Sequence, residues 1–173
     1  MPCKDFLTLA QSRYSCRKFK DTPVPQEALD KILLAGQVAP TACNLQPQRV
    51  HVLQSEDALA KLRLCTRCHF GAPLALLVCA DTTQCWKRRF DGQDSSWVDA
   101  SIVTTHMMMA AWDEGIGSTW VMHFDPAAVR AEYQLPDEQL PVAILVLGYP
   151  AEDAVPAPMH DDNKPLTDTV TYR

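Results

Sequence analysis

Two uninterrupted apolar segments limit the folds open to this chain more than any other feature. The first is LALLVCA at 74–80, bounded by Pro73 and Asp81, and the second is PVAILVLGYP at 141–150. A strand that is apolar at every position, and not only at alternate ones, has both of its faces covered. The two segments therefore predict inner strands of a sheet that carries helices on either side.

The segments around these two runs supply the other elements of the predicted fold. Alternating apolar residues indicate strands, and apolar residues three and four positions apart indicate helices. Further strands are predicted at 49–53 and 118–122, and helices at 5–12, 26–39, 56–65, 98–114 and 126–133. Helices and strands do not alternate strictly in this order, so we expect a mixed sheet with helices on both faces.

The helix at 98–114 is expected to lie in the centre of the molecule. Its apolar residues follow one another at spacings of four and three, which places them on one stripe. The stripe consists of Val98, Ile102, Thr105, Met109, Trp112 and, just beyond the helix, Ile116, and it is widened by Val103, Met107 and Ala110. We expect this stripe to face the core.

Composition and charge exclude several classes of protein. The 173 residues are 47% apolar and 21% charged, with a formal net charge of -5. These values are typical of a single globular domain, and they differ from the basic surfaces that bind nucleic acids and anionic membranes. No apolar run approaches the ~20 residues of a membrane span, and no secretion signal is visible. We therefore expect one cytoplasmic domain over residues 1–173, with reduced cysteines.

The last part of the chain, from about 151 to 173, differs from the segments before it. It is rich in proline and shows little periodicity, so it cannot form a core of its own. We expect it to extend over a surface, that of a partner subunit. The polar segment at 81–97 contains an Asp-Gly turn and is expected to be a loop or lid.

The pentapeptide CTRCH at 65–69 matches C-x-x-C-H, the attachment site of a c-type haem. Haem also needs an open apolar pocket and a second axial ligand, and covalent attachment takes place outside the cytoplasm. A zinc site needs two further ligands, and the sequence has no second C-x-x-C. We expect no metal site. We expect the segment to end the helix at 56–65. Two roles remain open for Cys65, Cys68 and His69: they have a structural role, or they lie beside an active site.

Motifs of several common enzyme classes are absent, which leaves three stretches as candidates for binding. There is no G-x-G-x-x-G after a strand, no P-loop, no H-E-x-x-H and no G-x-S-x-G. In the first remaining stretch, RYSCRKF, Arg13, Ser15 and Arg17 alternate, so an extended backbone aims all three side chains the same way. Two guanidinium groups on one face suit a phosphate or another anion.

The other two stretches offer uncharged groups. APTACNLQPQ at 39–48 provides Thr41, Asn44 and Gln46, which suit close contact with a flat polar heterocycle. EGIGSTWVMHFD at 114–125 contains glycines that let the backbone approach a ligand. Taken alone, each stretch also has a plain structural explanation, as a basic turn, a helix end or a helix-to-strand turn.

Taken together and in this order, the stretches resemble the FMN-dependent nitroreductase family, in its short oxidoreductase form. The matching motifs are R-x-S-x-R-x-F at 13–19, A-P-x-A-x-N-x-Q-P at 39–47, D-A-S-I-V-x-x-H-M-M in the central helix, G-I-G-S-T-W at 115–120 and L-G-Y-P-x-E-D at 147–153. The resemblance runs from about residue 8 to residue 166. It implies an α+β fold of three α/β/α layers around a mixed, mainly antiparallel sheet, assembled as a homodimer with FMN at the interface.

The resemblance also implies which residues contact FMN. Arg13 and Ser15 hold the phosphate with backbone help from Tyr14, and Arg17 lies toward the flavin N1/O2 edge. The remaining contacts come from Pro40, Thr41, Ala42 and Asn44 of the other subunit, with Gln46 beside them, and from Trp120, Val121, Met122 and His123 near the flavin N5/O4 edge. The family has a late arginine that also binds the phosphate. Here that position is Asn163, so Lys164 is expected to take its place.

The activity implied by the resemblance is an FMN-dependent oxidoreductase. Electrons pass from NADH or NADPH through flavin N5 to a nitroaromatic, a quinone or a similar small acceptor in a ping-pong sequence. No catalytic side chain and no metal are implied, because the cofactor carries the chemistry. The alternative is a carrier or sensor that holds FMN without NAD(P)H turnover, and weak phosphate binding at Asn163 suits that alternative.

Overall fold

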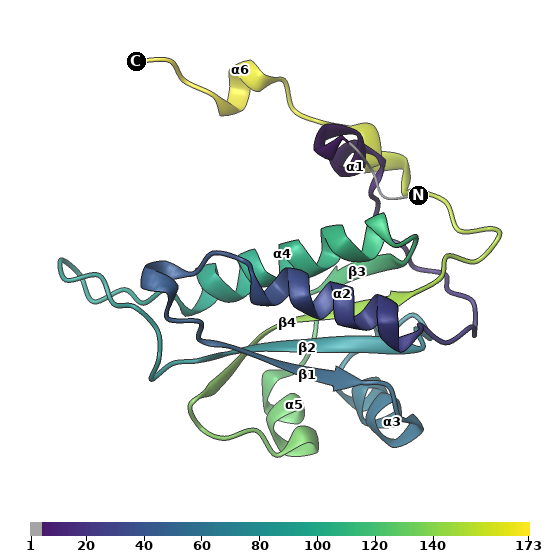
Figure 1. The fold of residues 1–173 in the computed structure, drawn as a ribbon, viewed down its shortest axis with the longest axis horizontal. Helices are drawn as coiled ribbons and strands as arrows, with labels where there is room; N and C mark the ends of the chain where they lie inside the picture. The colour runs from purple at the N-terminus through teal and green to yellow at the C-terminus, as the bar shows by residue number, and fades with distance from the viewer. Residues whose placement is uncertain (1–4) are drawn as a thin grey trace.

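A four-stranded antiparallel sheet forms the centre of the computed structural model, which describes residues 5–173. The strands are β1 (Gln48–Leu53), β2 (Leu74–Asp81), β3 (Gly117–Val121) and β4 (Gln139–Gly148), in the spatial order β1-β2-β4-β3 (Figure 1). The two apolar runs form β2 and β4, which lie side by side in the middle, and every residue from 74 to 80 is buried. The prediction of inner strands covered on both faces is confirmed.

Helices cover both faces of this sheet and complete the three expected layers (Figure 1). The helices α2 (Gln26–Gln37) and α4 (Ser96–Asp113) pack on one face, and α3 (Glu56–Cys65) and α5 (Pro126–Tyr133) on the other. Alternate residues of β2 enter the two cores, because side chains of a strand point to opposite faces in turn. The one parallel pairing found in the described part of the chain is an isolated bridge between Ser15 and Ser118.

The shorter elements lie at the ends of the chain and in the connections. They are α1 (Phe6–Ser12), α6 (Leu166–Thr169) and two 3₁₀ helices at Ala42–Asn44 and Pro158–Asp161. The predicted loop at 81–97 begins with the last residue of β2, Asp81, and then has no strand or helix before Ser96, apart from an isolated bridge between Lys87 and Asp94. Asp125 caps α5 by accepting hydrogen bonds from the Ala127 and Ala128 N–H groups, which fixes where the segment after β3 turns into that helix.

The expected orientation of α4 is wrong for most of its predicted stripe. Val98 and Thr105 are exposed, and Ile102, Met109 and Trp112 are only partly buried. The face of α4 that packs inward is formed instead by fully buried residues, namely Ala100, Val103, Thr104, Met107 and Ala111. Because α4 is apolar on two faces, its periodicity does not show which face meets the sheet.

Close contact between α2 and α4 fixes the inward face of α4. A Cβ atom added to Gly36 of α2 would lie 2.8 Å from the Met107 Cγ atom, which is closer than real side chains approach. Gly36 therefore accommodates the Met107 side chain, and Met107 sits in the core between the two helices and the sheet. On the outward side of α4, Val98 and Thr105 are exposed, whereas α1 and the segment after it contact Trp112 in the last turn.

The C-terminal tail leaves the layered body after β4. Its first part is fastened to the segment after α1, because the Ala151 N–H donates to the Lys18 carbonyl and the Lys18 ammonium pairs with Asp153. From Asp161 onward every residue is exposed. This part first passes beside α1, and Figure 1 shows the segment around α6 extending away from the other helices and the sheet. Within residues 5–173, no helix combines the length and the apolar character needed to cross a bilayer.

Substitution at two positions of α4 tests which face is buried. We expect Met107→Ala to lower the free energy of unfolding by about 2–5 kcal/mol, because it removes a fully buried side chain and leaves a cavity. The control is Thr105→Ala on the exposed face, for which we expect a change of about 0.5 kcal/mol or less. Denaturant unfolding measures both. Equal losses for the two variants would contradict this orientation of α4.

Candidate functional site

Cys16 anchors the segment after α1 to the start of β3. Its N–H donates to the Ser118 carbonyl at 2.9 Å, and its own carbonyl accepts from the Thr119 hydroxyl. Gly117 leaves room for this approach, because a Cβ atom there would lie 2.8 Å from the Cys16 Cβ atom. The Tyr14 ring packs edge-on against Trp112 of α4, with 5.2 Å between ring centroids. The segment is therefore held at the C-terminal end of α4.

The three alternating residues of this segment do not share one cavity in the single chain. Arg13 lines a cavity of about 440 Å³ together with Ala10, Gln11, His160, Asp161 and Asn163. Ser15 and Arg17 line another, of about 250 Å³, whose other wall is the tail at 153–158. The Arg17 guanidinium also donates to the Ser15 carbonyl at 3.1 Å. The expected common face of Arg13, Ser15 and Arg17 is thus split by the tail.

A small cavity at the end of β3 brings Arg17 together with the predicted residues of the third stretch. It has a volume of about 160 Å³ and is lined by Arg17, Cys68, Phe70, Thr119, Trp120, Val121, Met122 and His123. Met122 and His123 follow the last pair of the β3–β4 ladder, Val121 with Ile144, and both are exposed. Strand pairing ends here, so the N–H groups of these two residues can meet a ligand. Their carbonyls are already engaged, because that of Met122 accepts from the Phe124 N–H and that of His123 from the Thr66 hydroxyl.

The CTRCH segment contributes Cys68 to one wall of this cavity, and it is hydrogen-bonded to the 120–123 segment, which forms the other wall. Thr66 is buried, and its hydroxyl donates to the His123 carbonyl at 2.5 Å and accepts from the Cys68 N–H at 3.0 Å. The Cys65 carbonyl accepts from the Asp125 N–H at 2.9 Å. A single hydroxyl therefore couples the wall formed by Cys68 to the segment that follows β3.

The cysteines of CTRCH have the surroundings of structural residues. Burial raises the pKa of the Cys65 thiol to about 11, so this group is protonated at neutral pH, and it donates to the Lys61 carbonyl at 3.3 Å. The His69 Nδ1 atom accepts from the Gly71 N–H at 3.0 Å, in the turn that leads to β2. Throughout residues 5–173, no three His, Cys, Asp or Glu side chains are grouped so that they could hold a metal ion.

The stretch at 39–48 lies at the opposite end of α4. The Ala42 N–H donates to the Asp99 carboxylate at 2.9 Å, in the first turn of that helix, and the Gln46 N–H donates to the Thr41 hydroxyl oxygen at 3.1 Å. Cys43, Asn44 and Gln46 have positive φ angles of 52°, 54° and 52°. Left-handed conformations of residues other than glycine cost about 1 kcal/mol each, and they occur often at binding sites.

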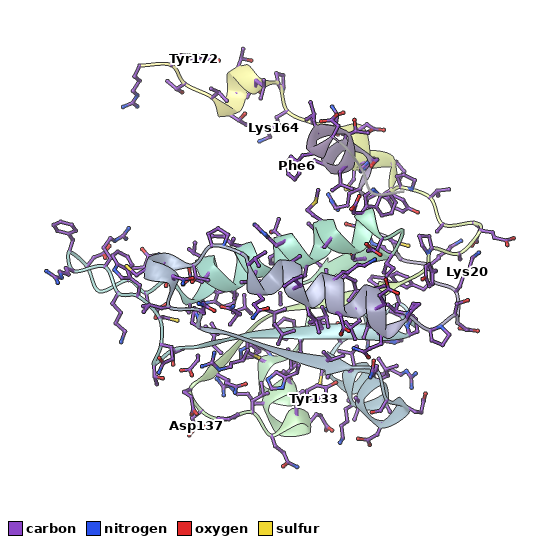
Figure 2. The ribbon with its side chains drawn as sticks, in the orientation of Figure 1. Phe6, Lys20, Tyr133, Asp137, Lys164 and Tyr172 are labelled. Atoms are coloured by element: carbon purple, nitrogen blue, oxygen red, sulfur yellow. The ribbon has the colours of Figure 1, made fainter. Side chains whose placement is uncertain are left out.

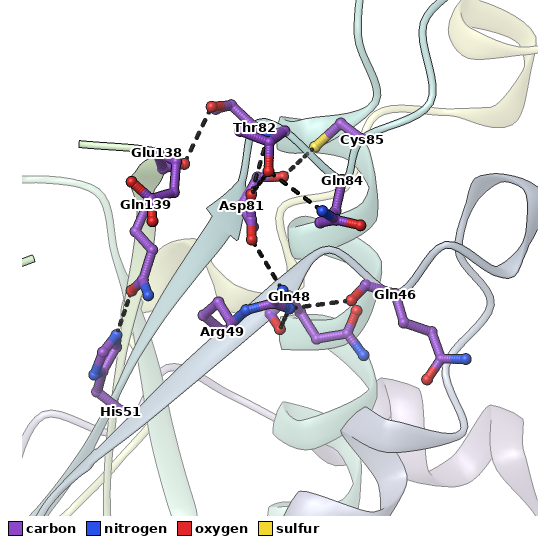
Figure 3. Close-up of polar contacts among 11 residues, drawn as sticks. Gln46, Gln48, Arg49, His51, Asp81, Thr82, Gln84, Cys85, Glu138 and Gln139 are labelled. Carbon is purple, nitrogen blue, oxygen red and sulfur yellow. Dashed lines mark hydrogen bonds and ion pairs between the residues drawn. The ribbon is translucent and has the colours of Figure 1, made fainter. Parts of the chain in front are cut away.

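Polar contacts join the end of this stretch to the central strands (Figure 3). The Arg49 guanidinium pairs with Asp81 at 3.0 Å and donates to the Gln46 and Gln48 carbonyls. Hydrogen bonds from Thr83, and then the Arg49 charge, lower the pKa of Asp81. Among side-chain nitrogen and oxygen atoms of the described residues, Gln48 Oε1 alone is buried without a hydrogen-bond partner. An unpaired buried acceptor costs about 1–3 kcal/mol, so a donor supplied from outside the chain is favoured there.

One chain does not bring all the predicted site residues together. Asp99 holds the stretch at 39–48 and Trp112 holds the segment after α1. These two residues are 13 positions apart in α4, which corresponds to about 20 Å along the helix axis. The strands beside the two groups, β1 and β3, are also opposite edges of the sheet. Lys164 belongs to neither group and lies in the exposed tail (Figure 2).

Comparison with known proteins identifies the family. A sequence model of the nitroreductase family matches residues 10–70 and 66–149. The chain belongs to the nitroreductase family. It is 30% identical to a protein of Thermus thermophilus named NADH dehydrogenase, over 91% of this chain and 92% of that protein.

Two solved structures of nitroreductases are similar to this chain and confirm its predicted fold. A nitroreductase family protein of Clostridium difficile 630 has 41% sequence identity and a TM-score of 0.92, and the match covers 97% of this chain and 98% of that one. An FMN-dependent nitroreductase of Clostridium difficile R20291 has 27% identity and a TM-score of 0.79, covering 96% and 98%. Both likenesses extend over nearly the whole chain, including the tail.

Sequence reasoning missed Thr66 and His160. Thr66 was only a spacer in the C-x-x-C-H pattern, and its hydroxyl meets a carbonyl 57 residues later. His160 joins Arg13 and Asn163 in one cavity, whereas the expected Lys164 is absent from its lining. The substitution at Asn163 was the one signal in the sequence that pointed to this part of the tail.

Removing the Thr66 hydroxyl tests the coupling between the two walls. We expect Thr66→Val to lower the free energy of unfolding by about 1–3 kcal/mol, because the His123 carbonyl and the Cys68 N–H lose their partner. The matched control is Thr104→Val. The buried Thr104 hydroxyl bonds only the Ala100 carbonyl of its own helix, so its loss should matter less. Equal effects in denaturant unfolding would show that Thr66 has no special role.

Proposed function

We propose that this nitroreductase family member is an FMN-dependent oxidoreductase. It takes electrons from NADH or NADPH and passes them to a nitroaromatic, a quinone or a similar acceptor in alternating half-reactions. The observation that carries the proposal is the cavity that joins Arg17 to Trp120, Val121, Met122 and His123. The names of the relatives, an NADH dehydrogenase and an FMN-dependent nitroreductase, support it.

The residues around β3 suit FMN, which supplies a hydride-accepting N5 atom when bound. Arg13 offers a guanidinium to the phosphate, in a cavity that also contains the His160 imidazole and the Asn163 amide. Arg17 places positive charge beside the 120–123 segment, where it stabilises the negative charge of a reduced flavin. Cys68 and Phe70 line the same cavity and help to exclude water from it.

We propose that two chains assemble as a homodimer and complete each site together. The stretch at 40–46 is held at the Asp99 end of α4, and none of its residues lines the cavity of Arg17. In the proposed dimer, the partner's copy of this stretch supplies Pro40, Thr41, Ala42, Asn44 and Gln46. Large apolar side chains remain exposed on one side of the layered body, among them Leu34, Val38, Trp97 and Val98. Exposed apolar area of this kind favours association.

The tail is proposed to lie on the partner subunit and to bring Lys164 there. Leu166, Val170 and Tyr172 are 76%, 42% and 94% exposed, so in a single chain the tail buries little apolar surface. Contact with a second chain would cover these side chains and order the tail at the same time. Residues 1–173 then act as one domain whose tail completes the neighbouring subunit.

A second candidate function is an FMN carrier or sensor. Asp161 lines the Arg13 cavity together with the uncharged Asn163, and a carboxylate there opposes binding of the FMN phosphate. A protein that releases flavin easily has such a mixed set of charges. The two candidate functions differ in whether NAD(P)H reduces the bound flavin.

A visible absorption spectrum distinguishes these functions. With FMN added, we expect the two-band spectrum of a bound flavin, which bleaches when NADH or NADPH is added without oxygen and returns with an acceptor. Arg17→Gln should slow bleaching about tenfold, because it removes positive charge beside the reduced flavin. The control is Lys20→Gln, an exposed lysine whose nearest ion-pair partner, Glu152, is 3.9 Å away.

The possible outcomes distinguish three interpretations, namely an oxidoreductase, an FMN carrier and a haem protein. A bound flavin that neither nucleotide reduces contradicts the oxidoreductase and favours the carrier. Failure to bind FMN at all contradicts both. A sharp Soret band would instead revive the haem interpretation of CTRCH. Unchanged bleaching in Arg17→Gln would remove Arg17 from the proposed site while leaving the activity in place.

Charge substitution on the outward face of α4 tests the homodimer. Val98→Glu should convert the dimer to a monomer and reduce FMN binding at least tenfold, because it buries an unpaired charge in the interface and separates the two halves of each site. Analytical ultracentrifugation and flavin titration measure the two effects. Leu64→Glu, which changes an exposed apolar residue of α3 on the other face of the sheet, is the control and should remain dimeric.

A further inference from the structure

A second cavity adjoins the one that contains Arg17. It has a volume of about 530 Å³ and is lined by Arg63, Leu64, Cys65, Thr66, Arg67, Met122, His123, Phe124 and Asp125. Met122 and His123 line both cavities. A molecule that occupies the second cavity can therefore extend past these two residues toward the first.

The lining of the second cavity carries more positive than negative charge. It has two arginines, Arg63 and Arg67, against one carboxylate, Asp125. Asp125 is already engaged, because it accepts from the N–H groups of Ala127 and Ala128 at the start of α5. Within residues 5–173, Arg67 has no ion-pair partner, and Arg63 pairs at 3.1 Å with Glu56, whose side chain is 84% exposed.

The Arg63–Glu56 pair leaves Arg63 available to a ligand. Ion pairs between exposed side chains are worth about 0–1 kcal/mol, so Glu56 can be displaced at little cost. A carboxylate or phosphate can then accept hydrogen bonds from Arg63 and Arg67 together, and such charge-assisted bonds are stronger than neutral ones. The lining of this cavity is net positive, although the chain as a whole has a net charge of -5.

The same cavity also offers apolar surface. Leu64 is 70% exposed and Met122 is 55% exposed, and both belong to its lining. An exposed thioether and an exposed leucine side chain suit contact with an aromatic ring. The lining therefore suits a molecule with a flat apolar body and a negatively charged group at one end.

We propose that this cavity binds the anionic group of the electron acceptor. The enzyme then prefers acceptors whose aromatic body carries a carboxylate or phosphate, held by Arg63 and Arg67, with the reducible group directed past Met122 and His123. This inference rests on the proposed oxidoreductase function and names the substrate class for that site. The nicotinamide nucleotides also carry phosphate, so the experiment distinguishes donor from acceptor.

A pair of acceptors that differ in charge tests the proposal. The FMN-loaded protein is assayed with 4-nitrobenzoate and with 4-nitrobenzamide, at a saturating donor concentration. In each first turnover, one NADH and one proton convert the nitro group to a nitroso group and water. We expect kcat/KM to be about tenfold higher for the benzoate, since a charge-assisted hydrogen bond contributes at least that factor.

Variants of the two arginines assign this preference to the cavity. Arg63→Gln/Arg67→Gln should lower kcat/KM for the benzoate about tenfold or more and leave the value for the benzamide unchanged. The matched control is Lys61→Gln. It removes one positive charge from α3, the helix that carries Arg63, but Lys61 pairs with Asp57 at 2.7 Å and is absent from the lining. This control should keep the preference for the benzoate.

Stopped-flow measurement of the two half-reactions provides the second readout. We expect the double variant to reduce its flavin at the wild-type rate with both NADH and NADPH, and to be slow only when the benzoate reoxidises it. Slower flavin reduction by the nucleotide would assign the cavity to the donor and overturn the proposal. Equal use of both acceptors by the wild-type protein would also overturn it. A flavin that no nucleotide reduces would instead contradict the proposed function itself.

Discussion

The antiparallel pairing of β2 with β4 is the contact on which the rest of the structure depends. Both strands are buried over nearly their whole length, so their backbone groups must pair with each other and their side chains need helices on both faces. β1 and β3 then complete the sheet at its two edges. The site follows from this arrangement, because β3 at one edge carries the 120–123 segment and β1 at the other edge begins after the 40–46 stretch.

The sequence predicts most of this fold because the decisive information is local. The apolar runs at 74–80 and 141–150 identify the inner strands without any knowledge of distant contacts. The orientation of α4 could not be predicted in the same way, because Val98 and Met107 are both apolar and lie on different faces. Only the packing against Gly36 decides between them. Thr66 could not be found either, since its partner His123 is brought near by the sheet and not by the chain.

Two separate features of the single chain point toward the same assembly. The candidate binding residues fall into two groups at opposite ends of α4, and Trp97 and Val98 near the start of that helix stay exposed. One arrangement of two chains around α4 would account for both. The family resemblance names the residues, and the structure adds that a single chain holds them in two separate groups.

Charge is distributed in a way that the net value of -5 conceals. Arg13, Arg17 and the pair Arg63 and Arg67 line three cavities near the segment after α1 and the end of β3. These linings hold two carboxylates, namely Asp161 beside Arg13 and Asp125, which caps α5. A negative chain with a locally positive cleft repels extended polyanions but still attracts a small anion, because fields in a cleft act over a few ångströms and are screened beyond about 10 Å. The composition that argues against nucleic acid is thus compatible with an anionic cofactor and an anionic substrate in neighbouring cavities.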